Sequence, residues 1–264
     1  MCLIALAWRT HSRYELALIA NRDEFHGRPT APAGVDPVRA DVYGGRDLAQ
    51  GGSWLLVSSR GRLAAVTNVR AGLAAEVAPR SRGVLVRDFA SGVATGENFM
   101  AALAPTAAGY GRFNLLLWDG ASLRFASNHP HFVTHALAPG VHAMSNGAFD
   151  THWPKSGHAT QALSSWLASP AADAAHANAG SVLAPLFDAL ADTTPAPDSA
   201  LPDTGVGLEL ERALSPPFVR GEHYGTRCSS VVLVGADAIT FVERRFGPDA
   251  QRAGDTAAIV HRRA

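Results

Sequence analysis

The sequence predicts an α+β layered protein, because groups of strands alternate with groups of helices along the chain. Apolar runs of strand length dominate residues 3–67, and segments with helical spacing follow in two blocks, near 81–103 and 154–191. No GxGxxG or P-loop motif follows a strand, so the nucleotide-binding folds lack their usual signature. The chain has 264 residues, 47% of them hydrophobic, and we expect a single domain over residues 1–264.

The first seventy residues predict two hairpins. Apolar runs over 3–8 and 14–20 flank a polar connection, which is typical of the first hairpin. Runs over 54–58 and 62–67 predict a second hairpin around the turn Arg60-Gly61. Between them, residues 28–52 are polar and contain several prolines and glycines, which predicts a loop.

The later segments predict two helical blocks, separated by strands. Ser81 is expected to cap a helix that ends near residue 90, and Pro154 to open a helix that ends near residue 167. Further helices are expected over 97–103 and 182–191, and strands over 113–118, 123–127, 141–145, 229–234 and 238–243. A polar tail with Arg262 and Arg263 then ends the chain, and 169–217 is the least informative stretch.

Charge, hydrophobicity and cysteine content limit the classes of partner and the cell compartment that we expect for this chain. Lys and Arg number 23, as do Asp and Glu, so a formal charge of zero disfavours nucleic acid or another polyanion. No apolar run approaches the ~20 residues of a membrane span. Arg9, His11 and Arg13 follow the first apolar run, the reverse of a signal peptide's order, and we expect a cytoplasmic protein. Two cysteines, Cys2 and Cys228, argue against a disulfide scaffold, although one disulfide between them remains an alternative.

Cys2 stands directly behind the initiator Met1 and ahead of an apolar strand. If Met1 is removed, Cys2 carries a free α-amine beside its thiol, and one residue supplies both nucleophile and base. The pKa of an α-amine is about 7.7–8 and that of a thiol about 8.5, so proton transfer between them is nearly balanced at neutral pH. The alternative is a cysteine that serves only as a small hydrophobic residue.

Three segments near the start carry a resemblance to a known family: Met1-Cys2-Leu3-Ile4, Ala20-Asn21-Arg22-Asp23-Glu24-Phe25 and Arg28-Pro29-Thr30. With Thr67-Asn68-Val69-Arg70, Ser145-Asn146-Gly147 and Gly225-Thr226-Arg227-Cys228-Ser229-Ser230, they make nearly the whole chain resemble the NRDE family. Its animal relatives are called transport and Golgi organization protein 2. The family is similar to the N-terminal-nucleophile hydrolases, especially the cysteine branch with bile salt hydrolase, penicillin V acylase and acid ceramidase. The resemblance implies a four-layer α/β/β/α sandwich with Cys2 at the end of its first strand.

The resemblance also implies catalytic roles. Cys2 matches the nucleophile, and Asp23 an aspartate that hydrogen-bonds the α-amine. Asn68 resembles the oxyanion-hole asparagine, and Asn146 a second asparagine that binds the oxyanion or the amine. Arg227 matches an arginine that lowers the pKa of the thiol. The hydrolases carry another arginine three positions before the aspartate, where this chain has Ala20.

Four further residues are expected to contribute to binding: Asn21, Arg22, Glu24 and Trp54. Arg22 is expected to form a structural ion pair and to point to the opposite face of the strand from Asp23. Trp54 ends a glycine-rich segment, from residue 44, that we interpret as a mobile wall beside Cys2. The alternative for the acidic and asparagine positions is a set of ordinary turn residues.

Two functions from different classes fit these residues. The first is an amidohydrolase or acyl-transfer enzyme acting on a small amide, thioester or lipid-like substrate, with no cofactor. The second is a non-catalytic carrier that uses the same pocket for a hydrophobic ligand, haem or an acyl-CoA, as the resemblance implies. No CxxCH motif is present for covalent haem attachment. His129, His131 and His135 could in principle face a metal, but no cysteine or acid completes a tetrahedral site, and we expect none. The sequence does not indicate an oligomeric state.

Overall fold

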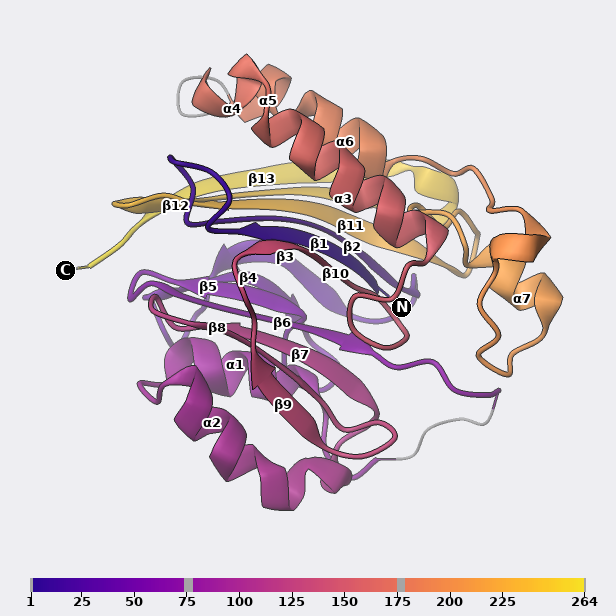
Figure 1. Cartoon of the computed structure of the whole chain (residues 1–264), viewed down its shortest axis with the longest axis horizontal. Helices are drawn as coiled ribbons and strands as arrows, with labels where there is room; N and C mark the ends of the chain where they lie inside the picture. The colour runs from indigo at the N-terminus through magenta and orange to yellow at the C-terminus, as the bar shows by residue number, and fades with distance from the viewer. Residues whose placement is uncertain (1, 74–77, 175–178, 264) are drawn as a thin grey trace.

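Two antiparallel sheets face each other in the computed structural model, and helices cover both outer faces (Figure 1). The structure describes residues 2–73, 78–174 and 179–263. The result is a four-layer α/β/β/α arrangement, in which the two sheets form the inner layers. This confirms the predicted fold class.

The first sheet has six strands in the order β10-β1-β2-β11-β12-β13. Its strands are β1 (Cys2–Trp8), β2 (Leu16–Phe25), β10 (Gly140–Met144), β11 (Tyr224–Val234), β12 (Ala238–Phe246) and β13 (Arg252–His261). The early strands β1 and β2 and the late strands β11 to β13 therefore lie in one sheet, with β2 and β11 at its centre and β1 also in its interior. Strands β1 and β2 are almost wholly buried, as expected for apolar runs covered on both faces.

The second sheet has seven strands in sequence order, from β3 to β9. They are β3 (Thr30–Val35), β4 (Val42–Asp47), β5 (Leu55–Ser58), β6 (Arg62–Asn68), β7 (Phe113–Trp118), β8 (Leu123–Ser127) and β9 (Val133–Ala136). Each strand pairs with its neighbour in the chain, and the connections are short except between β6 and β7, where α1, α2 and η1 intervene.

The helices form the two outer layers. Against the second sheet lie α1 (Gly83–Ser91) and α2 (Gly96–Leu103), followed by the 3₁₀ turn η1 (Ala104–Gly109). Over the first sheet lie α3 (Pro154–Leu167), α4 (Pro170–Ala174), α5 (Ala179–Val182) and α6 (Ala184–Leu190) (Figure 1). The short elements η2 (Asp198–Ala200), α7 (Leu208–Ala213) and η3 (Pro248–Ala250) complete the chain. None of the described helices is long and apolar enough to cross a membrane.

Three hydrophobic clusters fill the three spaces between the four layers. The cluster between the sheets includes Leu6, Leu18 and Trp118. A second joins α3 and α6 to the outer face of the first sheet, and a third joins α1 and α2 to the outer face of the second. Period-two alternation divides β1 between two of these clusters, because Leu6 faces the other sheet and Leu3 faces the helices.

Most elements confirm the sequence-based expectations. Both early hairpins are present, and the strands over 113–118 and 123–127 and the helix over 154–167 have the predicted bounds. The expected loop over 28–52 is wrong, because it contains β3 and β4. The glycines that indicated a loop have a packing role there: a Cβ on Gly45 would lie 2.2 Å from the Trp54 ring.

Three further expectations need correction. Ser81 does not cap α1, whose N-cap residue is Arg82 with no side-chain capping bond. The tail that follows β12 was expected to be an irregular polar segment, but it includes a full strand, β13. Its residues alternate between exposed and half-buried, as expected for a strand at the edge of a sheet. The exposed strand β9 and the short helices α4, α5 and α7 gave no clear periodic signal and were not expected.

Candidate active site

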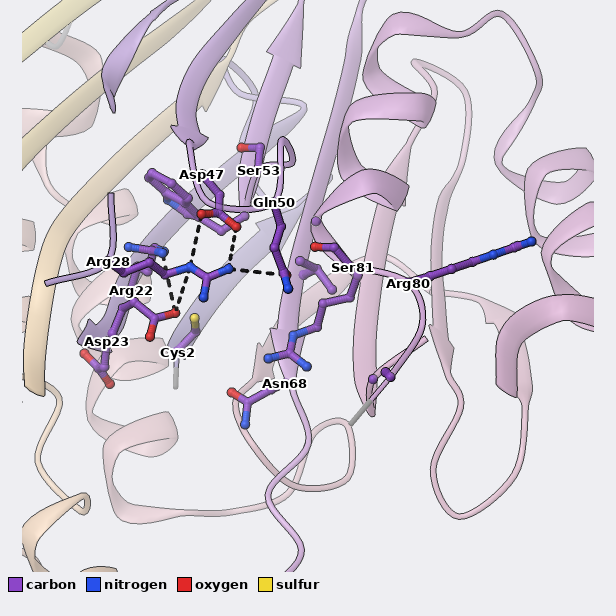
Figure 2. Close-up of a pocket in the computed structure, with 17 residues that line it drawn as sticks. Cys2, Arg22, Asp23, Arg28, Asp47, Gln50, Ser53, Asn68, Arg80 and Ser81 are labelled. Atoms are coloured by element: carbon purple, nitrogen blue, oxygen red, sulfur yellow. Dashed lines mark hydrogen bonds and ion pairs between the residues drawn. The ribbon is translucent and has the colours of Figure 1, made fainter. Parts of the chain in front are cut away.

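Residues 21–24 alternate between the two faces of the first sheet at the end of β2. Arg22 pairs with Cys2 of β1. Because cross-strand partners project from the same face, the side chains of Arg22 and Cys2 both face the second sheet. Asn21 pairs with Leu3 and faces the helices instead. Asp23 also points away from Arg22, as the sequence predicts (Figure 2).

A cavity of about 300 Å³ opens between the sheets at this point (Figure 2). Cys2, Arg22, Asp23 and Glu24 line one side of it, and Asn68, at the end of β6, lines another. The start of α1 closes a further side with Gly83 and the residues before it. The cavity therefore brings the end of β2 in the first sheet against the end of β6 in the second.

Asn146 fixes the orientation of Asn68. The Nδ2 of Asn146 donates to the Asn68 side-chain Oδ1 at 2.9 Å and to its backbone carbonyl at 3.0 Å. With its Oδ1 occupied as an acceptor, Asn68 keeps its own Nδ2 as a donor for a ligand in the cavity. Asn146 is fully buried and does not line the cavity. Its side-chain amide contacts Asn68, and the direct contact with the oxyanion or the amine that the sequence led us to expect stays a prediction.

The backbone of Cys2 is tied to the same turn. Ser145 Oγ donates to the Cys2 carbonyl at 2.9 Å. The turn is itself fixed from the second sheet, because Thr67 Oγ1 donates to the Ser145 carbonyl at 2.6 Å and Asn114 Nδ2 to the Gly147 carbonyl at 2.7 Å. These buried hydrogen bonds join the two sheets around the nucleophile candidate.

Asp23 lies in a buried polar group on the helix side of the sheet. Thr226 Oγ1 donates to its Oδ1 at 2.6 Å. Burial raises the pKa of Asp23, while the positive charge of Lys155 and the Thr226 hydrogen bond act in the opposite direction. Lys155 donates to the Leu214 carbonyl at 3.0 Å, and burial lowers its pKa to about 8.

Arg22 and Trp54 form the inner corner of the cavity. The Arg22 guanidinium stacks over the Trp54 ring at 4.3 Å, and it approaches Glu24 to 3.5 Å. The expected ion pair of Arg22 is thus present, and all three residues line the cavity. Burial raises the pKa of the Cys2 thiol, and Arg22 opposes this effect with its charge.

Arg28 organises the rim of the cavity. Its guanidinium binds both carboxylate oxygens of Asp47, at 3.0 and 2.7 Å, and donates to Gln50 Oε1 at 3.3 Å (Figure 2). Glu24 lies 3.8 Å from the same guanidinium. The bidentate geometry makes this a fixed group of polar side chains above Cys2.

Arg227 and Asn21 lie outside the cavity. Arg227 donates through Nη1 to the carbonyls of Phe25 and Arg28, and Arg22 takes the place beside Cys2 that we expected for it. Arg227 is the extra residue of a β-bulge between Thr226 and Cys228 and has no cross-strand partner on β2, whereas Arg22 pairs directly with Cys2. Asn21 is not a ligand-binding residue of this cavity, since its side chain donates to the carbonyls of Leu190 and Pro217.

Sequence reasoning missed several polar residues of the site: Arg28, Asp47, Gln50, Ser145 and Lys155. The first three come from the segment taken for a loop, and only pairing of β3 and β4 brings them over Cys2. Lys155 had a signal that could have found it. It is the only lysine in the sequence, which otherwise uses arginine for every basic residue, and it sits in an apolar helix face.

The remaining metal and disulfide alternatives are not supported by the described residues. Within residues 2–73, 78–174 and 179–263, no three His, Cys, Asp or Glu side chains form a group that could hold a metal ion. This covers His129, His131 and His135. Both cysteines are free, and Arg22 of β2 lies between them in the sheet.

The two facing antiparallel sheets with helices outside them define the N-terminal-nucleophile hydrolase-like class of folds. A solved structure of that class supports this assignment, the N-acylethanolamine-hydrolyzing acid amidase ortholog of Caenorhabditis elegans. It aligns with a TM-score of 0.50 at 10% identity, over 88% of this chain and 92% of its own.

Within this class, the chain belongs to the Transport and Golgi organisation 2 family, which it matches over residues 1–248. The Transport and Golgi organization protein 2 homolog of Bos taurus is 31% identical over 96% of both chains. The homolog of Homo sapiens is also 31% identical, over 92% of both chains. These findings confirm the resemblance seen in the sequence.

Proposed function

We propose that the protein is an N-terminal cysteine amidohydrolase or acyl-transfer enzyme for a small amide, thioester or lipid-like substrate. One observation carries this proposal: Cys2 shares a cavity of about 300 Å³ with Asn68, whose Oδ1 accepts from Asn146 and whose Nδ2 is thereby kept as the donor for a ligand. A nucleophile and an oriented oxyanion donor are the two elements that acyl transfer requires.

The reaction starts once Met1 is removed and Cys2 has a free α-amine. The amine takes the thiol proton, and the sulfur attacks the substrate carbonyl carbon. The C–N or C–S bond to the leaving group breaks as the ammonium proton passes to it, which leaves an acyl thioester on Cys2. Water or another acceptor then attacks this thioester, its proton passes to the amine and on to the departing sulfur, and the acyl product leaves. Asp23 hydrogen-bonds the amine during both steps.

The carrier function, for haem, an acyl-CoA or a lipid, draws less support from the cavity. Haem and acyl chains need a largely apolar pocket, whereas charged side chains such as Arg22, Glu24, Arg28 and Asp47 line this one. Titration with haem and with an acyl-CoA tests this function. Saturable binding that survives Cys2→Ala, together with no acyl transfer, would favour the carrier.

The main experiment uses untagged protein and p-nitrophenyl acetate, an activated ester. Intact mass should show loss of one methionine, and mixing should release a burst of p-nitrophenol as Cys2 is acylated. Cys2→Ala should abolish the burst, and Cys228→Ala should retain it because Cys228 is buried in the sheet. Retention of Met1, or a processed chain without a burst, would reject the mechanism.

Asn68 and Asn146 provide a second test of the same mechanism. Asn68→Ala should slow acylation by about 10²- to 10³-fold, since it removes the oxyanion donor. Asn146→Ala should also slow acylation, because Asn68 loses its orientation. Neither change should slow alkylation of Cys2 by iodoacetamide, a reaction that forms no oxyanion. Equal losses in both assays would point to general damage instead.

A further inference from the structure

A second, smaller cavity lies on the other side of Arg22 and Trp54. Its volume is about 90 Å³, and both residues line it as well as the larger cavity. Cys228, Glu243 and Arg245 contribute its floor from β11 and β12. At about 30 Å³ for each water molecule, the space holds about three waters or one ion of similar size.

Cross-strand pairing explains why these side chains meet. Cys2 pairs with Arg22, Arg22 with Cys228, and Cys228 with Arg245, so the four residues form one row across β1, β2, β11 and β12. Partners in such a row share a face. Glu243 lies two residues from Arg245 and therefore faces the same side.

Three buried polar atoms of this cavity lack a conventional hydrogen-bond partner among the described residues. They are Arg22 Nη1, Arg245 Nε and Glu243 Oε2. The Arg22 and Glu243 residues are only 6% and 1% exposed. Buried polar groups without partners destabilise a fold, and charged groups do so most strongly. Arg22 Nη1 and Arg245 Nε are donors at one cavity, which indicates a ligand that accepts hydrogen bonds from both, and Glu243 Oε2 can bond the same ligand only when it is protonated and donates.

The charges of the lining favour an anion. Three guanidinium groups, of Arg22, Arg227 and Arg245, surround the cavity against one carboxyl group, that of Glu243. Arg227 binds backbone carbonyls, and within the described parts of the chain neither it nor Arg245 has a carboxylate in ion-pair contact. Burial raises the pKa of Glu243, which reduces its repulsion of an anion.

Gly254 makes room for the Arg245 guanidinium. It pairs with Arg245 on the neighbouring strand, and a Cβ at Gly254 would lie 2.7 Å from Arg245 Nη2. Gly254 also has a φ of +113°, which side chains rarely adopt. Because Gly254 on the edge strand β13 has no side chain, the whole Arg245 guanidinium can line the second cavity.

We propose that the second cavity is a site for a small free anion of formate or nitrate size, held by Arg22 and Arg245, and that its occupation controls the reactivity of Cys2 through Arg22. Arg22 is the link because it faces both cavities. A bound anion offsets the positive charge that favours the Cys2 thiolate, so the thiol reacts more slowly when the site is filled.

The test measures alkylation of Cys2 by iodoacetamide at pH 8, with peptide mass spectrometry to separate Cys2 from Cys228. Sodium formate is titrated at constant ionic strength against sodium tosylate, an anion too large for the cavity. We expect formate to slow alkylation by about threefold with a saturable dependence, the effect of about half a pK unit. An equal effect of both anions, or no effect, would overturn the proposal.

Two variants and a crystal soak sharpen the result. Arg245→Met should remove the saturable formate effect, whereas Arg212→Met, at an exposed arginine paired with Asp198, should retain it. Crystals soaked in bromide should show an anomalous peak between Arg22 and Arg245, and water alone at that place would contradict the proposal. Alkylation requires no catalysis, so failure here leaves the proposed acyl transfer untouched.

Discussion

Lys155 is a buried amine close to the candidate nucleophile. It lies in the first turn of α3, where its Nζ donates to the Leu214 carbonyl and stacks near the Trp153 ring at 6.0 Å. Burial lowers its pKa from 10.5 to about 8, although Asp23 favours the charged form. Between about pH 8 and 10.5 Lys155 is therefore mostly neutral in the folded protein and mostly charged in the unfolded chain, and this difference makes the free energy of unfolding depend on pH.

We expect the free energy cost of burying Lys155 to fall as pH rises from about 8 to 10.5. In this range the unfolded chain binds the proton and the folded chain does not, so the free energy of unfolding increases with pH, by at most about 3 kcal/mol. Urea unfolding of the wild type and Lys155→Met at pH 7 and 10.5 measures this difference. Gln161→Met, on the exposed side of the same helix, should behave like the wild type, and parallel curves for all three proteins would contradict the assignment.

At the scale of elements, the start of α1 is held against the segment before β5. Ser53 N donates to the Gly83 carbonyl at 3.0 Å. A Cβ on Gly52 would lie 2.4 Å from the carbonyl carbon of Gly83. Because Ser53 and Gly83 both line the larger cavity, this backbone contact sets the position of its α1 side.

Gly52→Ala should therefore lower the free energy of unfolding by about 1–3 kcal/mol, since backbone atoms must move to accept the methyl group. The matched change is Gly157→Ala in α3, where a Cβ would meet nothing within 4 Å. It should stabilise the protein by about 0.5–1 kcal/mol through helix propensity and a less flexible unfolded chain. Thermal unfolding compares the two, and a stabilising Gly52→Ala would show that α1 is not fixed by this contact.

At the scale of the whole molecule, β13 completes the first sheet beyond the family match, which ends at residue 248. Ala258 and Val260 pack against the core between the sheets. Arg262 then extends to the second sheet, where its guanidinium lies 5.3 Å from the Trp118 ring, and it also donates to the Gly235 carbonyl. The last strand thus joins both sheets.

Removal of residues 252–264 should destabilise the protein by at least about 2 kcal/mol and expose the long edge of β12. We expect self-association as well, because unpaired edge strands recruit other chains. Arg262→Ala, which keeps β13, should cost less and remain monodisperse by comparison with the parent protein. Urea unfolding and light scattering distinguish the variants, and a truncated chain as stable as the full one would refute this role.

Much of the fold could be predicted because the early strands and α3 have strong local periodicity. The segment over 28–52 could not, because its glycines pack under Trp54 and against neighbouring backbone, contacts that local pattern does not contain. The candidate site divides in the same way. Cys2, Asp23 and Asn68 follow from strand ends and family motifs, whereas Arg28 and Lys155 enter it only through packing.

The sequence by itself determined the family, the layered fold and a cysteine directly behind Met1 and ahead of an apolar strand. Only the tertiary structure decided which side chains surround that cysteine. A single bulge in β11 takes Arg227 out of register, and strand pairing places Arg22 beside Cys2 instead. The physical reason is that the register of paired strands decides which side chains lie next to each other across a sheet, and that register depends on contacts between segments far apart in the sequence.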